Sequence, residues 1–275
     1  MPMKGDGYSL YSVLITGGTS GLGLELVRLY AGKGYNVITT GRRNKTPAEF
    51  SDNVHLVKVD FSSLALVSET VKEICKYNDI GIVINNAGVF SSPDLILTED
   101  NLEYTFQVNF LSHLLINEII IRNRNKEHNL LISVVTSPVY KTVESALKPG
   151  VSGKPYRRFK TYSESKFFLA LMCKYLSDVC KGAGVKIIGF DPGVFSSDIF
   201  RMQGRFLREL YRIAAPFMRN PATVASALGV ITGREDTKSG SVYDRHGRAF
   251  HVPLKDETLM ESFWIQCNGL IEKYL

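Results

Sequence analysis

Short apolar runs alternate with segments of helical periodicity along the chain up to residue 190. Six runs are short and rich in β-branched residues, as strands are; they span 12–16, 36–40, 54–59, 81–84, 130–135 and 185–190. Longer segments carry apolar residues three and four positions apart, as amphipathic helices do; they span 21–33, 62–77, 100–121 and 161–180. Strands that alternate with helices predict crossover connections and a parallel sheet.

The predicted fold class is therefore α/β, a doubly wound parallel sheet with helices on both faces. A length of 275 residues suits one large domain over 1–275, and no repeat, low-complexity tract or linker divides it. Two segments interrupt the alternation. Residues 138–160 are rich in proline, glycine and basic residues, and residues 196–221 carry a two-sided pattern of their own.

The composition indicates which kinds of ligand the protein can bind and in which cellular compartment it is expected. The net charge of +6 suits an anionic cofactor or an anionic lipid surface, and no nucleic-acid motif accompanies it. The four cysteines have no metal-ligand spacing, so we expect reduced thiols and no metal site. The polar start of the chain lacks a signal-peptide core, and no apolar run reaches about 18 residues. These features predict a cytoplasmic protein.

A glycine-rich turn separates the first predicted strand from the first predicted helix. It contains the candidate cofactor-binding residues Thr16, Gly17, Thr19, Ser20, Gly21, Leu22 and Gly23. Its glycines allow a tight turn and a close approach to a pyrophosphate. The helix that follows offers unpaired N–H groups and the positive end of its dipole. The alternative is an ordinary strand–helix turn, which the position of the motif directly after the first strand disfavours.

The Gly-x-x-x-Gly-x-Gly spacing with Thr16 before it resembles the short-chain dehydrogenase/reductase family, whose members have a Rossmann fold. The resemblance extends through most of the chain. Asn86, Ala87 and Gly88 follow the fourth strand and are similar to the family's NNAG element, which lies beside the adenosine. Asp60, followed by Phe61, matches the acidic residue that the family places near the adenine.

The end of the second predicted strand bears on which cofactor is used. NAD enzymes commonly place a carboxylate there to hold the ribose hydroxyls. This chain has Gly41 followed by Arg42 and Arg43, and guanidinium groups suit a 2′-phosphate. We therefore predict NADP(H) as the cofactor. The alternative is that the arginines form a solvated surface pair.

The candidate catalytic residues begin with Tyr162 and Lys166. Residues four apart share one helix face, so both side chains can point into one cleft. A free tyrosine is too weakly acidic to act as a base near neutrality, and we expect the lysine cation to lower its pKa. The resemblance implies that Lys166 also holds the nicotinamide ribose, that Ser137 binds the substrate oxygen, and that Asn109 supports a proton-relay water.

The loop after the sixth strand resembles the family's Pro-Gly-x-Val-x-Thr element. The resemblance assigns cofactor contacts to Pro192, Gly193, Phe195 and Ser197, although Phe195 replaces the valine and Ser197 the threonine. The backbone of Phe195 can still hold the carboxamide. Ser197 keeps a hydroxyl for the carboxamide or the pyrophosphate.

These residues predict an NADP(H)-dependent oxidoreductase that interconverts an alcohol and a ketone or aldehyde. The alternative is an NADP(H)-binding regulatory or scaffold protein without turnover. A long stretch between Ser137 and Tyr162, together with residues 109–113, loosely resembles the retinol dehydrogenase-like members. A lipophilic or aromatic small molecule is therefore the expected substrate.

Residues 196–221 form the predicted substrate lid. Apolar residues (Phe206, Leu210, Ile213, Phe217) and arginines (Arg201, Arg205, Arg208, Arg212) recur on roughly opposite helix faces. The apolar face suits a cover over the substrate, whereas the arginines leave peripheral membrane contact through 199–219 open. A homodimer formed through the long helices that hold Asn109 and Tyr162 is likewise open.

Overall fold

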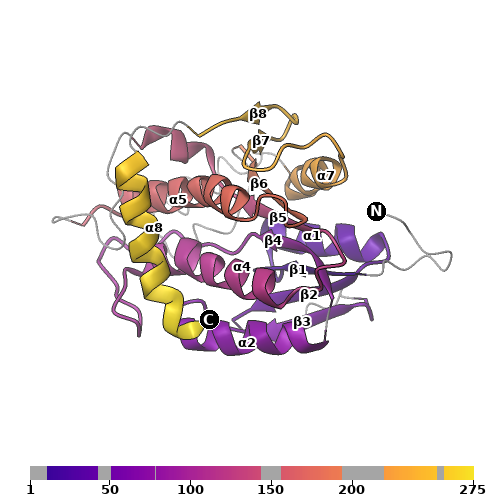
Figure 1. The fold of residues 1–275 in the computed structure, drawn as a ribbon, viewed down its shortest axis with the longest axis horizontal. Helices are drawn as coiled ribbons and strands as arrows, with labels where there is room; N and C mark the ends of the chain where they lie inside the picture. The colour runs from indigo at the N-terminus through magenta and orange to yellow at the C-terminus, as the bar shows by residue number, and fades with distance from the viewer. Residues whose placement is uncertain (1–10, 43–50, 78, 144–155, 194–219, 253–256) are drawn as a thin grey trace.

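An eight-stranded sheet forms the centre of the computed structural model (Figure 1). The structure describes residues 11–42, 51–77, 79–143, 156–193, 220–252 and 257–275. The strand order is β3-β2-β1-β4-β5-β6-β7-β8, and β7–β8 is the one antiparallel pair within the described sheet. The strands are β1 Ser12–Ile15, β2 Asn36–Gly41, β3 Val54–Lys58, β4 Ile80–Asn85, β5 Leu130–Val135, β6 Val185–Asp191, β7 Val242–Asp244 and β8 Ala249–Phe250.

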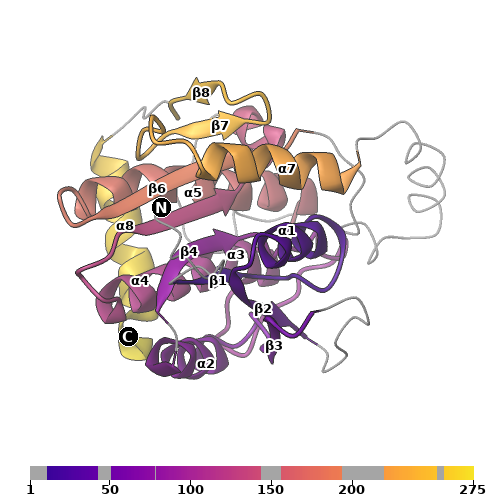
Figure 2. The same cartoon turned by 90° about the vertical axis from the view of Figure 1, so that its right-hand side faces the viewer.

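Helices cover both faces of this sheet (Figure 2). One face carries α1 (Gly21–Gly32) and α7 (Pro221–Thr232), which pack against each other. The other face carries α2 (Leu64–Tyr77), α4 (Ser112–Asn123), α5 (Arg158–Val179) and α8 (Glu257–Ile271). The predicted doubly wound α/β fold is therefore confirmed.

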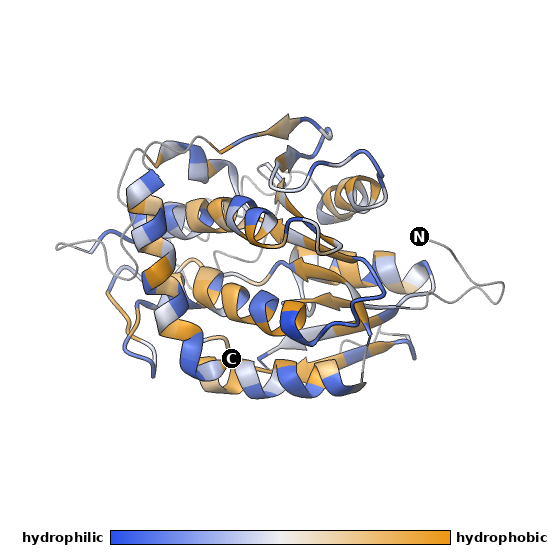
Figure 3. Cartoon of the chain, in the orientation of Figure 1, coloured by the Kyte–Doolittle hydropathy of each residue, from blue (hydrophilic) through white to orange (hydrophobic). Residues whose placement is uncertain are grey.

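Alternate residues of each central strand face opposite cores, because side chains alternate along a strand. Val13 and Ile15 pack beneath α1 and α7, whereas Leu14 belongs to the core beneath α2, α4 and α5. Both sides of the strands are therefore apolar, as the orange strands in Figure 3 show. This explains why the predicted strands have continuous apolar runs rather than an alternating pattern.

The helix predicted over 100–121 differs from the structure at its start. Helix begins at α3 (Tyr104–Phe106), passes through a π-helical turn, η1 (Gln107–Leu111), and continues as α4. Residues 97–103 instead form a turn closed by a bridge between Leu97 and Glu103. Asp100 is engaged in that turn, since its Oδ2 accepts hydrogen bonds from the backbone of Leu64 and the side chain of Gln107.

The elements beyond residue 220 had no counterpart in the sequence prediction. Among the described residues, they add two strands to the edge of the sheet, two α-helices and a short 3-10 helix, η5 (Glu272–Tyr274). In Figure 1, α8 runs across α4 and α5. Phe263, Trp264, Cys267 and Ile271 of α8 are buried in the core beneath it. The helices predicted to form a homodimer face are thus covered by α8 over part of their length.

Candidate active site

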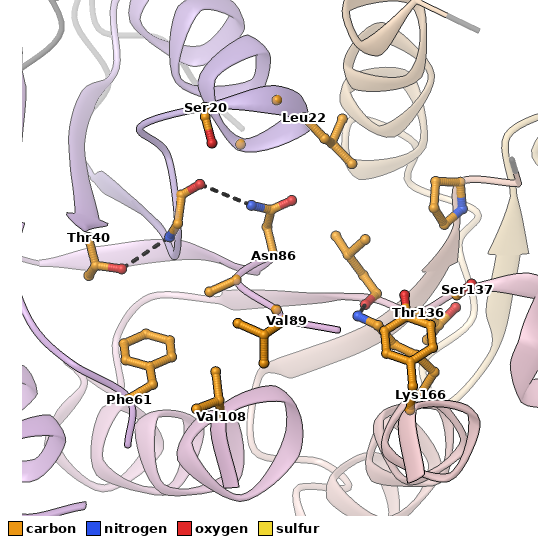
Figure 4. Close-up of a pocket in the computed structure, with 18 of the residues that line it drawn as sticks. Ser20, Leu22, Thr40, Phe61, Asn86, Val89, Val108, Thr136, Ser137 and Lys166 are labelled. Carbon is orange, nitrogen blue, oxygen red and sulfur yellow. Dashed lines mark hydrogen bonds between the residues drawn. The ribbon is translucent and has the colours of Figure 1, made fainter. Parts of the chain in front are cut away.

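A cavity of about 450 Å³ opens at the carboxyl ends of the parallel strands. It lies where the strand order reverses between β1 and β4, the place where such sheets bind ligands. Thr40 and Phe61 lie at one end, and Ser137 and Lys166 at the other, with Asn86 between them (Figure 4).

Most of the predicted site residues line this cavity. They are Gly17, Thr19, Ser20, Gly21, Leu22, Gly23, Arg42, Asp60, Phe61, Asn86, Ala87, Gly88, Ser137, Tyr162, Lys166, Pro192 and Gly193. Thr16 and Asn109 are buried behind the wall and do not line the cavity. Arg43, Phe195 and Ser197 lie outside the described residues, as does the lid segment up to residue 219.

The glycine turn brings backbone rather than side chains to the cavity. Gly17 has a φ of 71°, a left-handed conformation that favours glycine. A Cβ at Gly23 would lie 2.1 Å from the carbonyl oxygen of Gly17 and 2.6 Å from Nδ2 of Asn86. The side chain of the N-cap residue Ser20 makes no capping hydrogen bond. The first N–H groups of α1 are therefore open to an anionic group, and the turn fits a pyrophosphate.

Thr16 fixes the NNAG segment to this turn. Its buried Oγ1 accepts hydrogen bonds from the backbone N–H groups of Asn86 and Ala87, both at 2.9 Å. The side chain of Asn86 in return donates to the carbonyl oxygens of Thr16 and Gly17, at 2.9 and 3.3 Å. The residue after β1 and the residues after β4 are thus held as one unit.

Arg42 stands at the end of the cavity that holds Asp60. A Cβ added to the preceding Gly41 would lie 2.8 Å from Cγ2 of Thr19, so a carboxylate side chain has little room there. Nη1 of Arg42 donates to the hydroxyl of Tyr104 at 3.5 Å. Burial raises the pKa of Tyr104, and the charge of Arg42 opposes that shift. The guanidinium group of Arg42 therefore lies beside the cavity, at the end that also carries the carboxylate of Asp60.

Ser137, Tyr162 and Lys166 meet at the opposite end. Ser137 follows β5, and Tyr162 and Lys166 are one helical turn apart on α5. The side chain of Ser137 lies close enough to the Tyr162 hydroxyl to lower its pKa. Nζ of Lys166 lies 5.9 Å from the centre of the Tyr162 ring and donates to the carbonyl oxygen of Val135 at 3.2 Å.

The protonation of this pair differs from the sequence expectation. Burial raises the pKa of Tyr162 to about 12, against the opposing hydrogen bond from Ser137. Burial also lowers the pKa of Lys166 to about 8. Desolvation disfavours both charged forms, so the expected lowering of the tyrosine pKa by the lysine is not seen. At neutral pH the Tyr162 hydroxyl therefore holds its proton and can donate it.

Asn109 connects the loop after β4 to α5. Its Oδ1 accepts from the N–H of Val89 at 2.7 Å, and its Nδ2 donates to the Val89 carbonyl at 2.9 Å and to Ser165 Oγ at 3.0 Å. Ser165 Oγ donates to the carbonyl oxygen of Tyr162 at 2.7 Å. Its backbone carbonyl oxygen lies 2.8 Å from Nδ1 of His113, so Asn109 is engaged through both side chain and backbone, and its part in a proton relay stays a prediction.

Several lining residues had not been predicted. They are Thr40, Gly41, Val59, Val89, Tyr104, Val108, Val135, Thr136, Pro138 and Val139. Most follow a strand or a predicted site residue, and that position was the available signal. Tyr104 and Val108 come from the segment that carries Asn109, so only the course of that segment places them here.

Comparison with known proteins agrees with this arrangement. Residues 11–206 match the short chain dehydrogenase family. The chain belongs to that family. The resemblance expected from the glycine turn and the Tyr-x-x-x-Lys pair is thereby confirmed.

Two relatives illustrate the match. Mouse retinol dehydrogenase 13 is 26% identical over 94% of this chain and 83% of its own length. Human polyprenol dehydrogenase is 24% identical over 68% of this chain and 62% of its own length. The chain spans less than two thirds, 62–66%, of the length of several curated relatives that it matches. The predicted likeness to retinol dehydrogenase-like members is confirmed.

A solved structure supports the fold. The 3-ketoacyl-(acyl-carrier-protein) reductase of Brucella melitensis, solved as a complex with NADH, superimposes with a TM-score of 0.66. It covers 86% of this chain and 96% of its own, at 20% sequence identity. At that identity the likeness establishes the fold and not the ligand.

Proposed function

We propose that this short-chain dehydrogenase uses NADP(H) to interconvert an alcohol and a ketone or aldehyde. One observation carries the proposal: Ser137, Tyr162 and Lys166 line the same cavity as the glycine turn. A dinucleotide held at the turn would therefore extend toward the hydroxyl that moves the proton. A binding or scaffold protein without turnover would have no need of this set.

The chemistry that a bound nicotinamide supplies is hydride transfer at the carbonyl carbon. Tyr162 donates its proton to the carbonyl oxygen during reduction, and Ser137 donates a hydrogen bond to the same oxygen. The ammonium of Lys166 stabilises the tyrosinate that results. Oxidation of the alcohol uses the same groups in reverse. Because the pKa of Tyr162 is about 12, neutral pH favours its role as an acid.

The acid–base role is tested with Tyr162→Phe. We expect the substitution to abolish turnover, because it removes the transferable proton and leaves the ring in place. NADPH binding, followed by the change in its fluorescence, should be largely retained, since the phenol lies away from the glycine turn. The assay is a panel of lipophilic ketones, aldehydes and alcohols read through nicotinamide absorbance. Turnover that survives in Tyr162→Phe would contradict the assigned role.

The preference for NADP(H) rests on Arg42 and Gly41. A guanidinium group suits the 2′-phosphate, whereas NAD enzymes commonly place a carboxylate at the end of the second strand. We expect the unmodified protein to bind NADPH more tightly than NADH. Arg42→Ala should weaken NADPH binding roughly tenfold while changing NADH binding little, since a charge-assisted hydrogen bond contributes about 1.5–3 kcal/mol. Equal affinities in the unmodified protein would refute the preference.

The substrate end of the cavity favours a lipophilic or aromatic substrate. Val89, Pro138 and Val139 line the cavity with apolar surface. The relatives named as retinol and polyprenol dehydrogenases act, by their names, on lipophilic alcohols. We propose the same class here. The lid over 196–221 and membrane contact through 199–219 stay predictions, since nearly all of these residues lie outside the described ranges.

The cytoplasmic, or peripherally membrane-bound, location also stays a proposal. Across the described ranges, no helix has both the length and the hydropathy needed to cross a bilayer.

A further inference from the structure

His113 connects the two ends of the site from behind the cavity wall. It is the second residue of α4 and is completely buried. Its Nδ1 lies 2.8 Å from the backbone oxygen of Asn109, and its Nε2 lies 3.0 Å from Oγ1 of Thr16. One imidazole ring therefore contacts both predicted site residues that stand behind the cavity.

The partners of the ring determine which nitrogen carries the hydrogen. The carbonyl oxygen of Asn109 can only accept, so Nδ1 must donate to it. The Thr16 hydroxyl already accepts two hydrogen bonds, from the N–H groups of Asn86 and Ala87. It has no further lone pair for an N–H group, so Nε2 of His113 must be unprotonated. The hydroxyl hydrogen has two acceptors in reach, Nε2 at 3.0 Å and the carbonyl oxygen of Ile84 at 3.4 Å, and the shorter contact is the one with Nε2. The arrangement admits one neutral tautomer and excludes the imidazolium ion.

The surroundings of His113 also disfavour its charged form. The ring of Phe61, a cavity-lining residue, meets it edge-on at 5.4 Å. Burial lowers the pKa of His113 to about 4, and the positive charge of Lys166 adds to that shift. The charge of Lys166 thus disfavours the imidazolium ion, as the hydrogen-bond partners do.

Each contact of the ring acts on a different part of the site. Through Thr16, His113 supports the backbone that joins the glycine turn to the NNAG segment. His113 also donates to the backbone carbonyl of Asn109, which lies in the π-helical turn η1. The side chain of Asn109 in turn is hydrogen-bonded to Val89 and Ser165. π-Helical turns frequently occur at functional sites.

We propose that His113 is a neutral positioning residue, which sets the cofactor turn through Thr16 and the catalytic helix through Asn109. The role in turnover rests on the proposed function above. His113 does not line the cavity, so it acts through these two partners. The two contacts make separate contributions, which can be removed one at a time.

Two substitutions separate these contributions. An asparagine side chain can place its amide N–H near the position of Nδ1, whereas a glutamine side chain can place its amide near that of Nε2. His113→Asn should therefore keep the contact with Asn109 and lose the contact with Thr16. His113→Gln should do the reverse. His55→Gln is the matched control, because His55 is an exposed residue of β3 away from the cavity.

The expected outcome is a split between binding and catalysis. His113→Asn should weaken NADPH binding, measured by fluorescence, by about tenfold and lower kcat less, since an unsatisfied buried group costs roughly 1–3 kcal/mol. His113→Gln should lower kcat by about tenfold and weaken NADPH binding less. It should also shift the pH profile of kcat, which His113→Asn should not. Equal loss of both quantities in the two variants, in parallel with a loss of Tm, would show a merely structural role and overturn the proposal.

A measurement on the unmodified protein tests the two hydrogen bonds of His113 without any cofactor. The ¹⁵N chemical shifts of the imidazole report which nitrogen carries hydrogen, and comparison with His113→Gln assigns the signal. We expect hydrogen on Nδ1 alone from neutral pH down to about pH 5. Hydrogen on Nε2 in this range would overturn the proposal. Failure of NADPH to bind the unmodified protein would instead contradict the proposed function. The position of the hydrogen on the His113 ring would still show whether it makes the two proposed hydrogen bonds.

Discussion

At the residue scale, Lys166 combines burial with positive charge. It is 4% exposed, and its ammonium has one backbone carbonyl as its hydrogen-bond acceptor among the described contacts. Its pKa of about 8 in the folded chain lies below the ordinary value of 10.5. Between these values the unfolded chain binds more protons than the folded chain, so stability rises as pH rises through this range. Below about pH 8 the full cost of burying the charge is present.

Replacing the charged group should therefore stabilise the protein. We expect Lys166→Met to raise the free energy of unfolding by about 2 kcal/mol at pH 7, because it removes the buried charge. The gain should shrink as pH approaches 10, where the native lysine is neutral in the folded state. Urea denaturation without cofactor at pH 7 and pH 10 measures both values. Lys181→Met, at an exposed position, is the control, and a gain independent of pH would contradict the explanation.

The same residues show what local sequence can and cannot predict. Tyr162 and Lys166 lie on one helix, so their spacing alone was enough to predict that both side chains face one cleft, and both line the cavity. Their pKa values depend on desolvation by the rest of the chain, which local spacing does not contain. The contacts of His113 were likewise hidden, because Thr16 lies 97 positions away along the chain.

At the element scale, the start of α1 depends on the absence of a side chain at Gly23. Gly23→Ala would place a methyl group within 2.1 Å of the Gly17 carbonyl oxygen, so α1 would have to move away from the turn. We expect NADPH binding to weaken more than tenfold and stability to fall by about 1–3 kcal/mol, as in other overpacked sites. Fluorescence titration and urea denaturation measure the two effects.

Gly32 in the same helix provides the control. An added Cβ there meets no atom within 4 Å. Gly32→Ala should raise stability by about 0.5 kcal/mol, because alanine loses less backbone entropy in a helix. NADPH binding should be unaffected. If both alanine variants bind NADPH equally well, the close approach of α1 to the turn is not required.

The elements themselves were predicted unevenly. The six strands were found because a buried parallel strand is apolar on both faces. The start of the helix after β4 was predicted wrongly, because Asp100 and Glu103 are both acidic residues that can cap a helix N-terminus. The prediction began the helix at residue 100, whereas Glu103 is the N-cap in the structure. Tertiary contacts of Asp100, with Leu64 and with the hydroxyl of Tyr274, decide between them. No local pattern contains those partners.

At the scale of the whole molecule, α8 completes the core over α4 and α5. Phe263 is fully buried, and its ring centre lies 4.7 Å from that of Phe168 and 5.8 Å from that of Phe110. The spacing of Phe263, Trp264, Cys267 and Ile271 is helical and was the available signal for this element. Its partners, however, are distant in sequence, so its place across the two helices could not be predicted.

We expect Phe263→Ala to lower the free energy of unfolding by about 3–5 kcal/mol, the usual cost of a large buried aromatic side chain. Ile265→Ala, two positions along and 65% exposed, should change it by less than about 0.5 kcal/mol. Urea denaturation of both variants compares them directly. Similar losses in the two variants would mean that α8 does not pack as described. The position of α8 also matters for the predicted homodimer. Pairing through the parts of α4 and α5 that α8 covers would require α8 to move away.

The position of α8 has a consequence for synthesis on the ribosome. Phe110 and Phe168 emerge from the exit tunnel well before Phe263, and a chain stalled between them exposes an uncovered aromatic face. Such surfaces attract chaperones and drive aggregation. This face therefore reaches its final state only after α8 has been translated.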